Sequence, residues 1–236
     1  MKGINILDFH WAEQPWFNTV DYTVLQVILF TIGALLWVVA YICTLFNAYK
    51  RKNKKTLDIP VIAVVLNFGS EITTAFFWLP NMGKFLVLAY WAWMVLDIFI
   101  VIAMFRYGYL QFPHGIFKNN KKNLNRILFP AIVMSFLLQV FFILRYDVAM
   151  APVDNFIINL VMSICFINLI YVPGFTGNST RVAWSKFLGT GIISVMFYTK
   201  YPENNFLTAL YICCAVFDIL YIYLLHKKEN RAALTA

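Results

Sequence analysis

Seven apolar stretches, each long enough to cross a lipid bilayer, constrain the fold of this chain more than any other feature. A helix of about 20 apolar residues spans the roughly 30 Å of hydrocarbon in a bilayer. The connections between the stretches are short, so the sequence predicts an all-α bundle of seven transmembrane helices, forming a single domain over residues 1–236. The expected spans are 23–46, 59–80, 84–105, 127–144, 155–172, 182–200 and 206–226.

Composition agrees with a membrane protein. The chain is 61% apolar and 13% charged, whereas a soluble domain is roughly half apolar and a quarter charged. These values exclude a water-soluble enzyme and a disordered chain. Because the apolar stretches are continuous rather than alternating, they also exclude a transmembrane β-barrel. The net charge of +8 comes from loops beside the spans, so we expect membrane lipid as a partner and no nucleic acid.

Lysine and arginine gather in alternate connections, as they do in cytoplasmic loops. Since the number of spans is odd, the two termini are expected on opposite sides, with the N-terminus outside and the C-terminus cytoplasmic. The basic residues of these alternate connections are Lys50, Arg51, Lys52, Lys54 and Lys55, then Arg106, Lys118, Lys121, Lys122 and Arg126, then Arg181, and finally Lys227, Lys228 and Arg231.

Three acidic residues, Glu71, Asp97 and Asp218, fall inside the expected spans. A charged acid at the centre of a spanning helix costs roughly 2.5–3.5 kcal/mol on insertion scales, so such residues usually face an interior cavity or a partner. Counting residues from the span ends places all three within about two helical turns of the midplane. The simplest arrangement places all three acids around one interior cavity. Alternatively, the acids are neutral and only form hydrogen bonds that hold the helices together.

The neighbours of these acids suggest a chemistry. Asn67 lies one helical turn from Glu71, and Trp93 one turn from Asp97. A carboxylic acid among apolar side chains has its ionised form disfavoured, so it can keep a proton to donate. Aromatic residues make up 18% of the chain, and aromatic faces attract cations, although membrane filling alone also explains them. Together, the acids and aromatics favour protonation of an epoxide or alkene, followed by carbocation cyclisation.

Several short motifs carry a resemblance to a known family. They are Asn67-Phe68-x-x-Glu71, Trp93-x-x-x-Asp97, Gly177-Asn178-Ser179, Trp184-x-Lys186-Phe187-Leu188-Gly189-Thr190 and Asp218-x-x-Tyr221. In their order and placement they resemble the small seven-helix integral-membrane terpene cyclases of fungal meroterpenoid and indole-terpenoid pathways, which have bacterial relatives. The resemblance covers about residues 30–225. It implies cyclisation of a prenylated small molecule, with Glu71 and Asp218 as the acid machinery and without metal or diphosphate chemistry. Lys186 is a departure, since many relatives are expected to have Arg there.

The hypothesis from the sequence is therefore a multi-pass membrane terpene cyclase with a lipophilic prenylated substrate, no metal and no cofactor. Glu71 and Asp218 are expected to form or control the protonating site, with Asp97 and Asn67 in support. The candidate cavity walls are Trp78, Trp93, Trp184, Tyr211 and Tyr221.

Other functions compete with this hypothesis. A proton-coupled transporter or channel would use the same buried acids as a relay, but transporters usually show internal repeats or helices broken at the midplane, and no clear repeat is visible. A retinal protein would need a lysine in the last span, and 206–226 has none. A sensor or assembly partner would leave the acids structural. A carotenoid-type cyclase is the nearest enzymatic alternative.

Overall fold

The computed structural model describes residues 10–50, 56–117, 120–173, 175, 177 and 179–234. Seven α-helices form in this part of the chain, which confirms the predicted all-helical class and the number of helices. The helices are α1 Val24–Lys50, α2 Val61–Ile72, α3 Lys84–Tyr107, α4 Lys121–Tyr146, α5 Pro152–Ile170, α6 Thr180–Lys200 and α7 Asn205–Leu234. A π-helical turn, η2 (Thr73–Phe77), continues α2, and two 3-10 turns, η3 (Gly108–Gln111) and η4 (Gly115–Phe117), join α3 to the loop before α4.

Five of the helices, α1, α3, α4, α5 and α7, are long and apolar enough to cross a membrane. The other two fall outside this group for different reasons. The apolar helix formed by α2 and η2 is shorter, Val61–Phe77, and α6 carries Lys186 together with several Ser, Thr and Gly residues. An integral membrane protein is therefore supported, and seven crossings stay a prediction.

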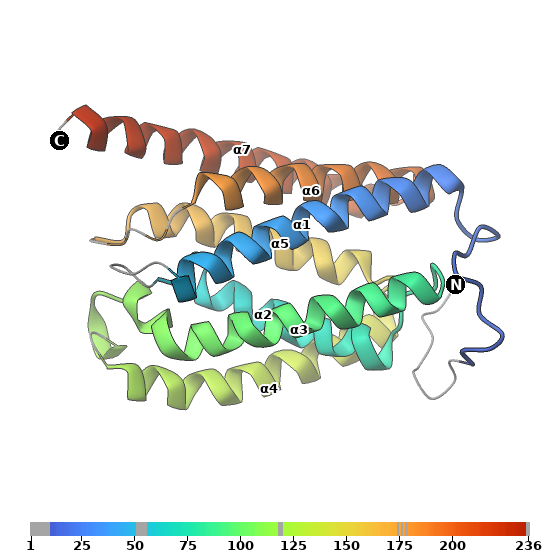
Figure 1. The fold of residues 1–236 in the computed structure, drawn as a ribbon, viewed down its shortest axis with the longest axis horizontal. Helices are drawn as coiled ribbons and strands as arrows, with labels where there is room; N and C mark the ends of the chain where they lie inside the picture. The colour runs from blue at the N-terminus through green and yellow to red at the C-terminus, as the bar shows by residue number, and fades with distance from the viewer. Residues whose placement is uncertain are drawn as a thin grey trace.

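The helices pack side by side along one long axis (Figure 1). The most extensive pairing is between α1 and α6, α5 packs on α7, and α2 contacts α3, α4 and α5. The first described residues and the end of α7 lie at opposite ends of the bundle (Figure 1), which agrees with an odd number of helices. The side of the membrane that each end faces stays a prediction; of its basic residues, Arg51, Lys52, Lys54, Lys55 and Lys118 lie outside the described residues.

Glycine permits the close crossing of α1 and α6. A Cβ atom built on Gly33 would lie 2.9 Å from the carbonyl oxygen of Gly189, and one built on Gly189 would lie 3.0 Å from that of Gly33. Small residues at such crossings let helix backbones approach within a membrane. The crossing fixes the part of α1 that carries Trp37, because a Cβ on Gly189 would also lie 2.9 Å from the Trp37 ring.

The second helix changes its geometry just after Glu71. The predicted span 59–80 is α-helical only to Ile72 and then widens into η2. The hydroxyl of Thr73 donates to the carbonyl oxygen of Gly69 (2.9 Å), and that of Thr74 to Ser70 (3.0 Å). Such side-chain bonds to the preceding turn bend helices, and π-turns frequently occur at functional sites.

The chain before α1 covers the turn between α2 and α3. The amide of Asn18 donates to the carbonyl oxygen of Met82, and the amide of Lys84 donates to that of Pro15, each at 2.9 Å. Gly83 adopts a φ of 109°, and a Cβ there would lie 2.6 Å from the carbonyl oxygen of Trp16. Glycine is therefore required where this segment crosses the turn.

Candidate active site

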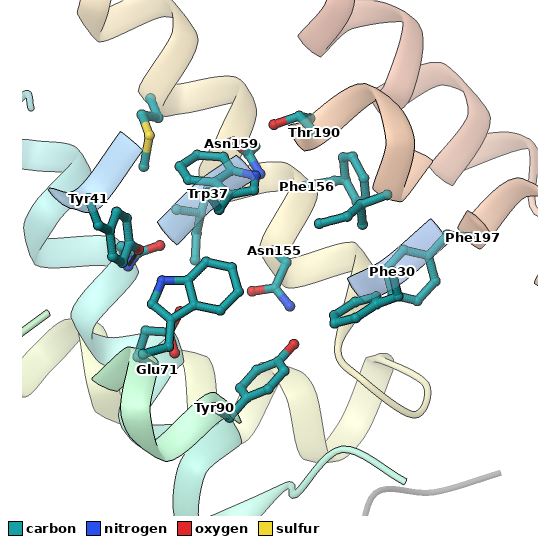
Figure 2. A pocket seen from close by; sticks show the side chains of 15 residues that line it. Phe30, Trp37, Tyr41, Glu71, Tyr90, Asn155, Phe156, Asn159, Thr190 and Phe197 are labelled. Atoms are coloured by element: carbon teal, nitrogen blue, oxygen red, sulfur yellow. Dashed lines mark hydrogen bonds between the residues drawn. The ribbon is translucent and has the colours of Figure 1, made fainter. Parts of the chain in front are cut away.

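A cavity lies within the bundle between α1, α2, α3, α5 and α6 (Figure 2). It contains about 640 Å³ of space free of protein atoms, including the open space at its mouth. Most of its wall is aromatic or aliphatic, with a few polar groups among them. The lining residues are Phe30, Trp37, Tyr41, Asn67, Glu71, Tyr90, Trp93, Asn155, Phe156, Ile158, Asn159, Met162, Thr190, Ile193 and Phe197.

Two of the three predicted acids, Glu71 and Asp97, lie near one another and near Asn67. Asn67 and Glu71 lie one turn apart on α2, and both line the cavity. The Asn67 side chain donates from Nδ2 to the hydroxyl oxygen of Tyr41 (2.9 Å) and to Oδ2 of Asp97 (3.0 Å). Asp97 is buried and is close enough to Glu71 for their charges to interact. The structure thus brings Glu71, Asn67 and Asp97 together, and Glu71 is the acid of the three on the cavity wall.

The third acid is placed differently. Asp218 on α7 forms an ion pair with Lys186 on α6, with Lys186 Nζ 2.6 Å from Oδ1 and 2.9 Å from Oδ2. Lys186 also donates to the hydroxyl of Ser163 at 2.7 Å. Lys186 and Asp218 are 1% and 2% exposed, and neither is among the residues that line the cavity. Their link to the cavity is Trp37, whose ring centroid lies 5.9 Å from Lys186 Nζ.

A continuous series of aromatic rings surrounds the cavity. Neighbouring centroids in the series are 5.6–6.5 Å apart, within the range of favourable ring contacts. In order of contact, the rings belong to Trp37, Tyr41, Trp93, Tyr90, Phe30, Phe197 and Phe156. Such a wall excludes water and presents ring electrons to any cation formed inside.

The five aromatic residues predicted from the sequence are divided between this wall and other places. Trp93 lines the cavity. Trp78 is buried and donates from Nε1 to the carbonyl oxygen of Val148, and Trp184 is 43% exposed. The Tyr211 ring packs against the cavity residue Phe156, with centroids 4.6 Å apart, and Tyr221 packs against Phe166. The last four are not among the residues that line the cavity.

Asn155 is a polar residue of the cavity that the sequence does not single out. Its amide donates to the carbonyl oxygen of Met150 (3.1 Å) and accepts from the hydroxyl of Ser70 (3.3 Å). Met150 and Ala151 are buried and adopt φ values of 72° and 48°, a region that costs non-glycine residues roughly 1–2 kcal/mol each. This strained loop fixes the start of α5, and no pattern in the sequence marks it.

Asp147, in the loop before α5, anchors the same region. Its carboxylate accepts three backbone N–H groups from the loop and the first turn of α5, at 2.7–3.2 Å. Burial raises the pKa of the Asp147 carboxyl group above its ordinary value, and these hydrogen bonds act in the opposite direction. Asp147 therefore caps the start of α5, the helix that carries Asn155.

Four buried polar atoms on the cavity wall have no hydrogen-bond partner within the described residues. They are Glu71 Oε2, Trp93 Nε1, Asn159 Oδ1 and Thr190 Oγ1. Buried polar atoms are normally paired, because leaving one unpaired costs about 1–3 kcal/mol. Their presence around one cavity indicates a site that can receive polar groups of a ligand.

No cluster of three His, Cys, Asp or Glu side chains suited to a metal ion occurs in the part of the chain that the structure describes. The polar groups of the cavity are instead one acid, amides, hydroxyls and an indole N–H. These groups are suited to hydrogen bonding and proton transfer.

The chain belongs to the Pyr4-like transmembrane terpene cyclases, whose family model matches residues 9–230. The match confirms the resemblance identified from the sequence motifs; it covers α1 to α6 completely and α7 as far as residue 230. No curated protein and no solved structure matches the chain. The protein is therefore an enzyme of the terpene cyclase type.

Proposed function

We propose that this protein cyclises a lipophilic prenylated small molecule by protonating an epoxide or alkene near the end of its prenyl chain. The observation that carries the proposal is Glu71, whose Oε2 lies buried on the wall of an aromatic cavity with no hydrogen-bond partner among the described residues. A carboxylic acid in such surroundings keeps its proton until a substrate accepts it. Membership of a terpene cyclase family supports the reaction class.

The proposed reaction is an isomerisation, so no atom is gained or lost. Glu71 transfers its proton to the epoxide oxygen, and the C–O bond breaks as the π electrons of the neighbouring alkene form a new C–C bond. In the alkene case the proton adds to carbon. The final carbocation loses one proton and the Glu71 carboxylate regains one, so the protons balance over the cycle. These reaction steps require neither a metal nor a diphosphate leaving group.

Asn67 and Asp97 are proposed to orient and tune Glu71. Asn67 shares its face of α2 and is held by Asp97 and Tyr41. The negative charge of an ionised Asp97 would disfavour a second charge on Glu71, which favours the protonated donor. Asp97 therefore assists without contacting the substrate.

Asp218 is proposed to control the site through electrostatics. Lys186 lies 5.9 Å from the Trp37 ring centroid, and an uncompensated cation there would oppose a carbocation in the cavity. Asp218 neutralises that charge through its ion pair with Lys186. The ring of Trp37 then stays available to a cation on the cavity side.

The decisive experiment uses purified protein in detergent, where no ion gradient exists. A phenol bearing a terminally epoxidised farnesyl chain is incubated with the wild type, and ring formation is followed by chromatography and NMR of the isomeric product. We expect conversion by the wild type and loss of conversion in Glu71→Gln, which keeps the shape of the side chain but removes its acidic proton. Glu203→Gln, an exposed loop residue, provides the same chemical change outside the cavity and should keep full activity.

Cyclisation at the wild-type rate by a well-folded Glu71→Gln variant would show that another group donates the proton. A wild type that moves protons or substrate across vesicles but forms no ring in detergent would instead favour the transporter.

A further inference from the structure

Two of the unpaired polar atoms lie apart from the acid. Asn159 is on α5 and Thr190 on α6, and Figure 2 shows them on one side of the cavity, with Glu71 on the other side. Thr190 is 4% exposed, and its hydroxyl oxygen has no partner within the described residues. The Oδ1 atom of Asn159 is also buried, and no described residue donates a hydrogen bond to it.

The hydroxyl of Thr190 differs from other helical threonine hydroxyls in this chain. A threonine in a helix commonly donates to the carbonyl oxygen four residues earlier. Thr31, Thr44, Thr73, Thr74 and Thr208 all do so, at 2.8–3.2 Å. Thr190 lacks this bond, has no other partner in the described part of the chain and lines the cavity, so its hydroxyl is available to a ligand.

Asn159 likewise differs from the other asparagine side chains of the cavity, because its amide oxygen has no partner among the described residues. Asn67 and Asn155 are both held by hydrogen bonds to neighbouring residues, whereas Asn159 Oδ1 is not. An amide oxygen requires a donor, and a threonine hydroxyl can donate or accept. A hydroxyl group satisfies both residues at once, because it donates to Asn159 and accepts from Thr190.

We propose that Asn159 and Thr190 form a head-group subsite that binds a hydroxyl on the ring of the prenylated substrate. This inference rests on the proposed function and extends it. With the hydroxylated ring at Asn159 and Thr190, the prenyl chain lies along the aromatic rings of Trp37 and Phe156, and its end reaches Glu71. The subsite thus sets the direction in which the substrate lies and selects phenols or enols among prenylated molecules.

The test measures binding with two unreactive probes, hexahydrofarnesyl phenol and hexahydrofarnesyl benzene, which differ only in the hydroxyl. Quenching of tryptophan fluorescence in detergent gives a Kd for each, because Trp37 and Trp93 line the cavity. We expect the wild type to bind the phenol about 10-fold more tightly, as one well-formed hydrogen bond allows. Thr190→Val and Asn159→Leu should each reduce this preference to within about two-fold.

Thr44→Val is the matched control, since it removes the same atoms from a buried threonine that donates to Ala40 and does not line the cavity. It should keep the wild-type preference. Equal binding of the two probes by the wild type, or a preference that survives both cavity variants, would overturn the subsite. Cyclisation is assayed separately, so a wild type that prefers the phenol but forms no ring would refute the proposed function and leave the subsite standing.

Discussion

Glu71 and Asp218 are both buried acids on membrane helices, yet the protein surrounds them in opposite ways. Asp218 has Lys186 within 2.6 Å and lies away from the cavity wall. Glu71 lies on that wall and has one carboxyl oxygen with no partner in the described residues. Burial and depth therefore do not distinguish the two roles. The difference lies in whether a partner inside the protein already satisfies the acid.

This comparison separates two kinds of functional contribution. An acid in a buried ion pair matters for the stability of the fold, because removing either partner leaves the other charge buried and uncompensated. An unpaired acid on a cavity contributes little to folding and is available to a substrate. The following variants test this division, beginning with the largest expected effect.

Replacing Glu71 should separate activity from stability most clearly. We expect Glu71→Gln to lower kcat by about 10²- to 10⁴-fold, the usual contribution of a general acid. The thermal unfolding midpoint in detergent should stay about the same, because one neutral polar side chain replaces another and both leave a polar atom unpaired on the cavity wall. A marked fall in the midpoint would show that Glu71 is a structural residue like Asp218.

Removing one member of the Lys186–Asp218 pair should mainly affect folding. Asp218→Leu leaves the Lys186 ammonium buried without its counter-charge, which should lower the free energy of unfolding by about 3–5 kcal/mol. The double variant Lys186→Met with Asp218→Leu should recover most of that loss, since replacing a buried pair by apolar residues is often neutral. Unfolding midpoints of the two single variants and the double variant measure this coupling.

The activity of the same double variant tests the role of Asp218. If Asp218 only neutralises Lys186, removing both charges restores cyclisation. An inactive double variant with wild-type stability would show that Asp218 takes a direct part in proton transfer.

Hydropathy predicts the helices of this fold well, because lipid imposes a length and an apolar composition on each span. The expected span 84–105 corresponds to α3, Lys84–Tyr107, and 182–200 to α6, Thr180–Lys200. The expected span 59–80 is less accurate, since the hydrogen bonds of Thr73 and Thr74 accompany a π-turn that hydropathy does not reveal.

The site is only partly predictable from the sequence. Contacts between residues on different helices depend on how each helix is rotated about its axis, and the sequence does not give that rotation. Spacing placed Asn67 beside Glu71, and both line the cavity. The pairing of Lys186 with Asp218, 32 residues away, has no local signal. Trp37 and Tyr41 were also missed, since membrane helices are rich in aromatics on every face and the sequence does not mark the faces that turn inward.

A variant of intermediate effect tests Asn67, which lies one helical turn from Glu71 and is itself hydrogen-bonded. Asn67→Leu removes the donor to Tyr41 and Asp97, so we expect a stability loss of about 1–3 kcal/mol. We also expect roughly a 10-fold fall in kcat, about the effect of one lost hydrogen bond of ordinary strength on the donor's orientation. Unfolding midpoints and initial rates should therefore both change, unlike in Glu71→Gln. A change in the unfolding midpoint alone would mean that Asn67 only stabilises the fold, and a change in the rate alone would mean that it only supports catalysis.

The smallest effects should come from Trp93 and Trp184, which the sequence analysis places together as candidate cavity walls. Trp93 lines the cavity with an unpaired Nε1, whereas Trp184 is 43% exposed. Trp93→Phe keeps an aromatic ring but removes the N–H group and part of the ring face, so a fall of about 5- to 10-fold in kcat/KM is expected. Trp184→Phe should leave kcat/KM within about two-fold, because Trp184 is not among the residues that line the cavity and exposed substitutions seldom disturb the fold. Steady-state rates on one prenylated epoxide compare the two directly. Equal losses would mean that the substrate also contacts the α6 surface around Trp184, and the cavity would then not be the whole site.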